Sequence, residues 1–352
     1  MFKKLLFLST FLLFLACKKE NNTSEKQNQL PLSYAKHISV YEDDETLTIE
    51  SNGNKTIFNQ SELPLTKVMV ESTAAITFLS ELNELSVIKG IVDPDYIYNP
   101  EMRKKIANRE VLQIGTISEL YPEVILKEKP QVIITNTNPA LAKFHQQLEE
   151  NGIKVLYIDE YKENDPLGRL EYLKVFGKLM KKEDLANQKV TKIAQQYDSI
   201  KSIIQTKGKN EVKTIVNTMF GDVWYLPSGS VLQAKLIDDA KGNYVYKAKT
   251  GENSINLGFE QVYADAKEAT HWLNPNFATL AEMKANYPNY EWIKAFKEGN
   301  VYNSNKRVLE SGAQDYFEQG IIRPDLILND LGKIFHPELF PNYELYFYQQ
   351  IK

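Results

Sequence analysis

Two hydrophobic patterns follow one another along the chain. Residues 37–59 alternate apolar and polar positions on either side of the turn pair Asn52-Gly53, which predicts antiparallel strands. From Lys67 onward, short apolar runs alternate with amphipathic segments of helical spacing. Strands that alternate with helices favour a parallel sheet that is covered on both faces. The pattern therefore predicts an α/β fold preceded by a small β leader.

The first α/β region is predicted to hold four buried strands separated by helices. The strands are KVMVES, VIKGIVD, QVIIT and KVLYID, and the helices are TAAITFLSELNEL, EVILKEKP and ALAKFHQQLEENG. The last of these helices ends at Gly152, a residue type that is common just after a helix C-terminus. Together with the leader, this region forms a predicted N-terminal lobe at residues 33–165.

A helix pair is predicted at residues 166–206. Asp165 suits the N-cap position and Pro166 suits the first helical turn. Apolar residues then recur at spacings of three and four over residues 185–204, which indicates one long helix. Strands and helices alternate again afterwards, so residues 207–352 form a C-terminal lobe. The predicted fold is two Rossmann-like lobes with parallel central sheets, joined by a long backbone helix.

The N-terminus has the pattern of an export signal. Two lysines precede an apolar stretch that ends at Ala16 and is too short to span a bilayer stably. Residues 1–16 are therefore predicted to be a signal peptide. The next residue, Cys17, stands where the lipobox of a bacterial lipoprotein has its lipidated cysteine, although Phe14 departs from the usual aliphatic residue. An ordinary signal peptide followed by a chance cysteine remains the alternative.

Residues 17–32 are polar and lack apolar periodicity, which predicts a flexible tether. The remainder would then be held at a bacterial membrane outside the cytoplasm, on the periplasmic side of the inner membrane or on the outer membrane. The composition is that of a globular protein, with 43% hydrophobic and 25% charged residues and a net charge of -4. This charge gives no reason to expect a nucleic-acid partner, and the single cysteine cannot form an internal disulfide.

Several stretches in this order resemble a known family over roughly residues 67–340. They are KVMVESTAAITFLSELNELSVIKGI, PEVILKEKPQVII, GRLEYLKVFGKLMKKEDLA, WYLPSGSVLQAKLIDDAKGN and LGFEQVYADAKEATHWLN. They resemble the helical-backbone (class III) substrate-binding proteins of ABC importers for ferric siderophores, haem or cobalamin. Gln131 departs from the family pattern, which usually has Asp there. The resemblance implies a monomer that carries a small-molecule metal chelate to an ABC permease dimer.

Ligands of such two-lobed folds bind between the lobes, beyond the carboxyl ends of the parallel strands. This rule selects loops at residues 71–73, 93–98, 136–138, 160–161, 224–225 with 228–230, 253–256, 272–274 and 303–307. Within them the candidate ligand-binding residues are Ser72, Thr73, Tyr96, Tyr98, Asn136, Trp224, Tyr225, Ser228, Trp272 and Arg307.

Some of these candidates have alternative roles. Trp224 and Tyr225 precede a Gly/Ser loop, where aromatic rings could stack on a bulky ligand. Ser72 could instead cap a helix. Arg307 could pair with an anionic chelate or form a surface ion pair.

The expected ligand is an iron chelate, with haem and cobalamin as alternatives and no resident cofactor. A bare-metal site is not expected, because only His271 of the four histidines lies near the predicted cleft. An enzyme is not expected either, because the chain lacks a GxSxG elbow, a phosphate-binding P-loop and an HExxH helix. A surface lipoprotein that hands its ligand to an outer-membrane receptor is a further alternative. The long linking helix predicts a preformed cleft with only modest closure.

Each predicted lobe has a glutamate in the first turn of a helix. Glu123 follows Pro122, and Glu260 leads the helix FEQVYADA. A carboxylate is favoured at a helix N-terminus by the helix dipole. The family resemblance implies a second role for such a pair, in which the two glutamates meet arginines on the two halves of the permease.

Overall fold

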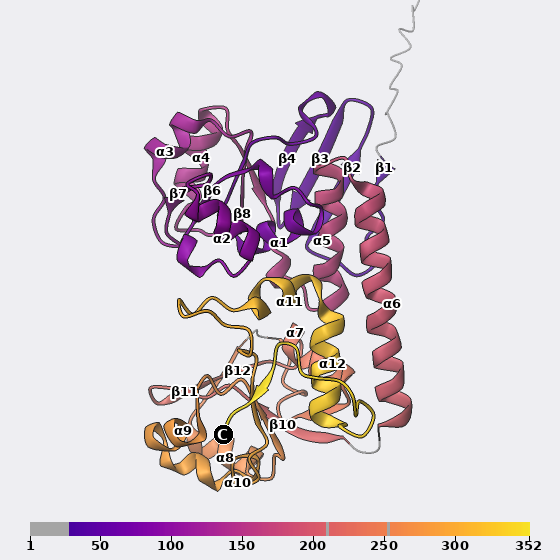
Figure 1. The fold of residues 1–352 in the computed structure, drawn as a ribbon, viewed down its shortest axis with the longest axis vertical. Coiled ribbons are helices and arrows are strands. Elements are labelled where there is room, and N and C mark those ends of the chain that lie inside the picture. Colours follow the sequence, from indigo (N-terminus) through magenta and orange to yellow (C-terminus); the bar gives the residue numbers. More distant parts are fainter. Residues whose placement is uncertain (1–27, 209–210, 252–253) are drawn as a thin grey trace, which may run out of the picture.

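The computed structural model describes residues 28–208, 211–251 and 254–352. Figure 1 shows two lobes stacked end to end, with α6 (Glu183–Lys207) running along one side of both. The predicted signal peptide and Cys17 lie outside the described residues. The predicted tether ends earlier than expected, because β1 (Asn28–Gln29) pairs with β2 (Ile38–Glu42). Residues 28–32 therefore belong to the N-terminal lobe.

The leader is an antiparallel sheet in the order β1-β2-β3-β4. Its other strands are β3 (Thr46–Ser51) and β4 (Asn54–Asn59), and the turn between them is Asn52-Gly53 with φ angles of 48° and 85°. Left-handed φ values at both central residues match the twist of a tight hairpin. The predicted hairpin is confirmed.

The N-terminal lobe is built on a parallel sheet in the order β7-β6-β5-β8-β9. Its strands are β5 (Val68–Val70), β6 (Ile88–Val92), β7 (Leu112–Gly115), β8 (Val132–Thr135) and β9 (Lys154–Tyr157). Its helices are α1 (Thr73–Glu81), α2 (Pro100–Ala107), α3 (Pro122–Glu128) and α4 (Ala142–Glu150), with 3-10 turns at Gln60–Glu62, Leu85–Val87, Pro94–Tyr96 and Glu160–Lys162. Four strands match the prediction, whereas α2 and β7 were not predicted.

Side-chain alternation along β5 places hydrophobic layers on both faces of this sheet. Val68 and Val70 pack into the cluster that includes α1, and Met69 points to the opposite face, where it packs with Ile125 of α3 and Leu148 of α4. Because helices cover both faces, the strands are buried on both sides, as parallel sheets require.

The helix pair consists of α5 (Pro166–Leu179) and α6, as predicted. Asp165 caps α5 by accepting a hydrogen bond from the Leu167 N–H at 2.9 Å. With 25 residues, α6 is ~37 Å long and reaches from one lobe to the other. The C-terminal helix α12 (Pro324–Phe335) packs along it (Figure 1).

The C-terminal lobe has a sheet in the order β13-β10-β15-β16-β17. Its strands are β10 (Val212–Val216), β13 (Gly242–Tyr244), β15 (His271–Leu273), β16 (Val301–Asn303) and the antiparallel edge strand β17 (Gln349–Gln350). A small antiparallel sheet of β11 (Met219–Phe220), β12 (Val223–Pro227) and β14 (Ser254–Leu257) was not predicted. The helices are α7 (Leu232–Asp239), α8 (Phe259–Ala266), α9 (Leu280–Asn286) and α10 (Lys294–Lys297), with a 3-10 turn at Pro288–Trp292. After β16, a 3-10 turn at Asp315–Phe317 leads to α11 (Gln319–Ile322), which packs against α1 and α5 of the N-terminal lobe. The two-lobed α/β fold is thus confirmed.

Candidate functional site

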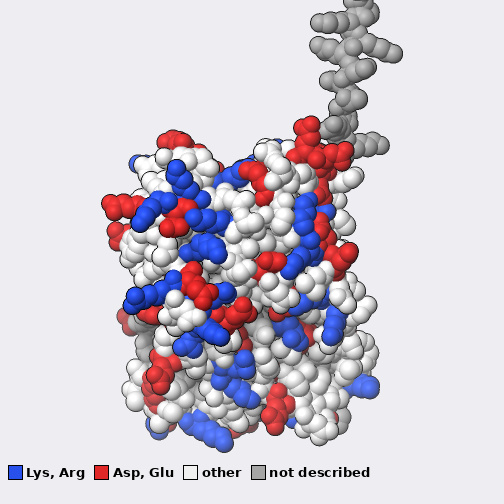
Figure 2. Space-filling view, turned by 45° about the horizontal axis from the view of Figure 1, so that its top comes forward, with Lys and Arg blue, Asp and Glu red and all other residues white. Residues whose placement is uncertain are grey.

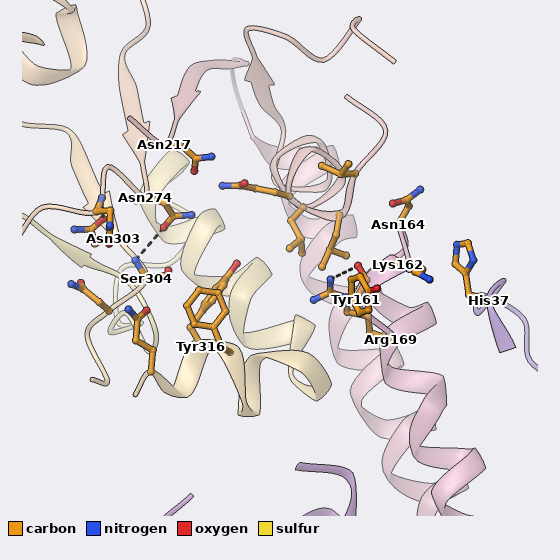
Figure 3. Close-up of a pocket in the computed structure, with 18 residues that line it drawn as sticks. His37, Tyr161, Lys162, Asn164, Arg169, Asn217, Asn274, Asn303, Ser304 and Tyr316 are labelled. Carbon is orange, nitrogen blue, oxygen red and sulfur yellow. Dashed lines mark hydrogen bonds between the residues drawn. The ribbon is translucent and has the colours of Figure 1, made fainter. Parts of the chain in front are cut away.

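A cavity of about 790 Å³ lies between the lobes. Its N-terminal wall is formed by His37, Tyr161, Lys162, Asn164 and Arg169 (Figure 3). Its C-terminal wall and floor are formed by Asn217, Val231, Leu232, Gln233, Leu236, Asn274, Asn276, Asn303, Ser304, Asn305, Gln314, Tyr316 and Phe317. The cavity therefore lies where the rule for open α/β sheets places a ligand.

The C-terminal wall consists largely of side-chain amides at strand ends. Asn217 follows β10, Asn274 follows β15 and Asn303 ends β16. Asn217 and Asn274 have φ angles of 58° and 55°, a left-handed conformation that asparagine tolerates better than most residues. The Asn274 Oδ1 accepts a hydrogen bond from the Ser304 N–H at 3.2 Å, so these loops brace one another. This wall offers both donors and acceptors without formal charge.

The N-terminal wall carries a guanidinium with spare hydrogen-bonding capacity. Arg169 on α5 donates from Nη2 to the Tyr161 carbonyl at 2.9 Å. Its Nε is buried and has no hydrogen-bond partner among the described residues. Behind it, burial raises the pKa of Glu160 to about 7, although the positive charge of Arg169 acts in the opposite direction. A buried unpaired donor is costly, so an acceptor that reached the Arg169 guanidinium would be stabilised there.

Lys162 is held beside this arginine by a buried carboxylate. Its Nζ donates to Asp159 Oδ2 at 2.9 Å, and Asp159 also accepts from the Thr137 N–H at 2.7 Å and the Thr137 hydroxyl at 2.6 Å. Burial alone would raise the pKa of Asp159, but the hydrogen bonds it accepts outweigh burial and hold the pKa below its usual value. Asp159 therefore stays ionised at neutral pH and fixes the ammonium group at the cavity wall.

The predicted tryptophans do not line the cavity. Trp224 lies on β12 and Trp272 on β15, both with 0% of their surface exposed. Their rings stack at a centroid distance of 5.4 Å, and each indole N–H donates to a backbone carbonyl, of Val216 at 3.0 Å and of Asn217 at 2.7 Å. Because their only polar atoms are satisfied inside the core, their assignment as ligand-stacking residues is wrong.

The other predicted residues of the C-terminal lobe also lie outside the cavity lining. Ser228 is buried, and its hydroxyl lies 2.9 Å from that of Ser230. Tyr225 is exposed on the small antiparallel sheet rather than in a loop. Arg307 forms an ion pair with Asp315 at 2.6 Å, so the alternative interpretation of this residue holds.

In the N-terminal lobe the predicted residues mostly stabilise loops and helix ends. Ser72 accepts from the Ala74 N–H at 3.2 Å and caps α1, with Thr73 in the first helical turn. Asn136 donates to the Ile158 carbonyl and to Glu160, beneath the wall. Tyr96 is exposed and Tyr98 packs under the Arg307 guanidinium, 5.6 Å from it, and neither lines the cavity.

The loop rule nevertheless selected some of the cavity residues. Tyr161, Asn274 and Asn303 lie in loops that the sequence placed at the cleft. His37, Lys162 and Arg169 were missed. The available signal for Arg169 was its place in the first turn of the predicted helix pair, immediately after the fourth strand.

Comparison with known proteins agrees with this architecture. The profile of a family described as periplasmic binding protein matches residues 82–308. The chain belongs to the periplasmic binding protein family. An uncharacterized lipoprotein of Methanocaldococcus jannaschii is 30% identical over 301 residues, which cover 83% of this chain and 70% of that protein.

Solved structures share the fold of this periplasmic binding protein at low sequence identity. A possible iron-binding (periplasmic solute-binding) protein from Staphylococcus epidermidis has a TM-score of 0.62 at 15% identity, with 78% of this chain and 99% of that chain covered. CeuE from Helicobacter pylori, with Ni(II) bound, has a TM-score of 0.63 at 16% identity, covering 84% and 91%. An ABC-type Fe3+-hydroxamate transport protein from Saccharomonospora viridis has a TM-score of 0.59 at 17% identity, covering 82% and 98%.

Family membership sets the general activity. The periplasmic binding protein is a solute-binding protein of the ABC-importer type, not an enzyme, and the family acts outside the cytoplasm. Among residues 28–208, 211–251 and 254–352, no helix is long and apolar enough to cross a membrane. No group of three or more His, Cys, Asp or Glu side chains in those ranges is arranged to hold a metal ion.

The two glutamates predicted to dock the permease lie in equivalent places in the periplasmic binding protein. Glu123 is exposed in the first turn of α3, and Glu260 is exposed in the first turn of α8. Neither helix has a side-chain hydrogen bond at its N-cap. Their contact with a permease stays a prediction.

Proposed function

We propose that this periplasmic binding protein captures an anionic iron chelate, such as a ferric siderophore, and delivers it to an ABC importer. Haem and cobalamin are the alternative ligands on the same fold. The bound chelate is a transported solute, and the protein needs no resident cofactor.

The charge of the cavity is the observation that carries this proposal. The chain has a net charge of -4, and acidic and basic side chains are interspersed over the face shown in Figure 2. The cavity, in contrast, is lined by Lys162 and Arg169 and, among the residues that the structure describes, by no aspartate or glutamate. Fixed cations in a partly desolvated site favour an anionic ligand. The surrounding amides and the exposed rings of Tyr161 and Phe317 can contact the polar and apolar parts of a chelate.

The names of proteins with this fold add support for iron. Two of the similar structures are described as a possible iron-binding protein and as part of an Fe3+-hydroxamate transport system. Their identity to this chain is low, so they support an iron-containing ligand but do not indicate which chelate it is.

Titration calorimetry on the purified chain tests this proposal. The probes are ferric citrate, a ferric tricatecholate, a ferric trihydroxamate, haem, cobalamin and free Fe3+. Arg169→Ala is expected to weaken binding by about 10- to 100-fold, since a hydrogen bond to a charged group is worth about 1.5–3 kcal/mol. Arg103→Ala on the exposed surface of α2 is the matched control and should bind normally. Equal binding by both variants, or no binding of any chelate by the wild type, would contradict the proposal.

We also propose that Glu123 and Glu260 dock the two halves of the permease. Their equivalent, exposed positions, one in each lobe, support this role. The Glu123→Ala/Glu260→Ala variant should keep its affinity for the chelate and lose most uptake of labelled chelate into cells. Glu101→Ala, in the first turn of α2, is the control and should transport normally. Full transport by the double variant would show that the two glutamates do not contact the permease and only stabilise the N-termini of their helices.

A lipid anchor on Cys17 completes the proposal. The 30% identical relative is described as a lipoprotein, and the lipobox-like sequence supports the same modification here. Metabolic labelling with palmitate should mark the wild type and not Cys17→Ser. Cell fractionation then distinguishes delivery to an inner-membrane importer from the alternative of a surface lipoprotein that serves an outer-membrane receptor.

A further inference from the structure

The β leader precedes the segment that matches the family profile, which begins at residue 82. Its entry segment is nevertheless fixed to the body by two buried carboxylates. Glu171 on α5 accepts from the backbone N–H groups of Ser33, Tyr34 and Ala35 at 2.9, 2.7 and 2.9 Å. Glu163 accepts from the next two N–H groups, those of Lys36 and His37, both at 2.9 Å. Five consecutive backbone donors thus hold the leader against the start of α5.

This attachment places His37 at the cavity, on the same side as Lys162 (Figure 3). His37 is half-buried, and its Nδ1 lies 3.2 Å from the Asn52 Oδ1. The Asn52 Nδ2 in turn donates to Asp159 Oδ2 at 2.8 Å. The leader therefore reaches the cavity wall through both its entry segment and its β3–β4 turn.

This chain of contacts determines the tautomer of the histidine. Asp159 is ionised and can only accept, so the amide nitrogen of Asn52 must face it. The amide oxygen then faces His37, and the Nδ1 must carry a proton. The Nε2 is left without a hydrogen-bond partner among the described residues. The same carboxylate, Asp159, thus orients both the His37 ring and the Lys162 ammonium.

We propose that the leader forms part of the ligand-binding wall and that His37, through Nε2, donates a hydrogen bond to an anionic oxygen of the bound chelate beside Lys162. This inference rests on the proposed function. Because Nδ1 already carries a proton, donation from Nε2 as well requires both ring nitrogens to be protonated, so the proposal predicts a proton on each of them in the complex. The charged groups around the ring are Asp159, Glu163 and Lys162 on the body and Lys36, Glu50 and Lys55 on the leader. Glu160, under the same wall, is a second group that can take up a proton, and the test separates the two.

Calorimetry of the full chain in detergent is done at pH 7 with ferric citrate and the ferric tricatecholate. Two buffers of different ionisation enthalpy report the number of protons taken up. His37→Ala should weaken binding about tenfold and lower the proton uptake. His37→Gln, which keeps a side-chain donor, should recover part of the affinity but not the proton uptake. Lys36→Ala, next in sequence but outside the cavity lining, is the matched control and should match the wild type.

The outcomes separate this inference from the proposed function. In a protein that already carries Glu160→Gln, His37→Ala should still lower the number of protons taken up on binding. If the wild type binds a chelate and both His37 variants bind it with unchanged affinity and proton uptake, the inference is wrong while the proposed function stands. If the wild type binds neither of these probes nor any other chelate, both are overturned together.

Discussion

At the scale of residues, Glu160 and Arg169 are opposite charges at one wall of the cavity, where Arg169 lines the wall and Glu160 is buried beneath it. Their side chains share no hydrogen bond within the described part of the chain. Arg169 donates to the Tyr161 carbonyl, whereas Glu160 accepts a long hydrogen bond, 3.4 Å, from Asn136 and one from its own backbone N–H. Since burial raises the pKa of Glu160 to about 7, this carboxyl changes charge near neutral pH. When ionised it offsets the charge of Arg169, which an anionic ligand would otherwise meet.

The pH dependence of Glu160→Gln follows from this arrangement. In the wild type the folded pKa is raised from 4.5 to about 7, so the folded state binds more protons between these values. The stability contributed by the protonated carboxyl is fully present below pH 4.5 and is lost as the pH rises through 7. Glutamine does not titrate, so Glu160→Gln does not lose this stability. The difference in free energy of unfolding between the variant and the wild type should therefore move in favour of the variant by about 1–3 kcal/mol as the pH rises from 5 to 8. Urea denaturation at both pH values measures the difference.

The same variant should bind an anionic chelate more tightly than the wild type at pH 8 and equally at pH 5. Asn164→Ala, also at this wall but without a charge, should show the same pH dependence as the wild type. Parallel stability curves for Glu160→Gln and the wild type from pH 5 to pH 8 would show that Glu160 does not titrate in this range.

The carboxyl-end rule could identify loops of the cleft from the sequence, because it depends only on strand order. Within these loops, residues were chosen because their side chains could contact a ligand. Several of these choices were wrong because the side chains are buried in the core. Trp224 is buried because β12 pairs with β14, where it stands opposite Leu257. This partner is distant in sequence, and no local pattern marks the pairing. The missed residues Lys162 and Arg169 look like ordinary surface cations of a helix start until the opposite lobe is in place.

At the scale of elements, the contact between α6 and α12 depends on a glycine. A Cβ atom on Gly332 would lie 2.7 Å from the Phe340 Cε2 and 2.9 Å from the Ile204 Cδ1. Such distances are below van der Waals contact, so the Phe340 ring and the end of the Ile204 side chain would have to shift to admit a Cβ atom at this position. The apolar periodicity of residues 185–204 predicted α6, and α12 falls in the predicted alternation of strands and helices of the C-terminal lobe. The sequence could not show that they pack together, because helical spacing reports a buried face and not its partner.

Gly332→Ala should therefore destabilise the protein despite the better helix propensity of alanine. Overpacking of this kind costs about 1–3 kcal/mol, which exceeds the ~1 kcal/mol gained by replacing a helical glycine. Gly320→Ala in α11 is the control, since its Cβ would meet the nearest atom at an ordinary 3.4 Å. Thermal unfolding should show a lower midpoint for Gly332→Ala only. A midpoint at or above that of the wild type would show that the side chains around Gly332 can accommodate a Cβ atom without loss of stability.

At the scale of the whole molecule, the lobes are joined by more than the predicted helix. After β16 the chain returns to the N-terminal lobe, where α11 packs against α1 and α5, and α12 then runs back beside α6 (Figure 1). The returning segment is fastened by Glu318, which is buried and accepts from the backbone N–H groups of Tyr98 and Asn99. Three passes of the chain between the lobes resist rotation more than one helix would.

This connectivity predicts only a small change of shape on binding. Small-angle scattering curves with and without the chelate that calorimetry selects should be nearly superimposable, because rigid helices and the Glu318 attachment oppose a hinge rotation. Glu318→Ala removes that attachment from Tyr98 and Asn99, and it should permit a larger ligand-induced change. Glu310→Ala, at the exposed tip of the same segment, is the control and should behave as the wild type. A wide rotation in the wild type would show that the cleft is not preformed. Part of the binding free energy would then be used to close the cleft, which would lower the affinity.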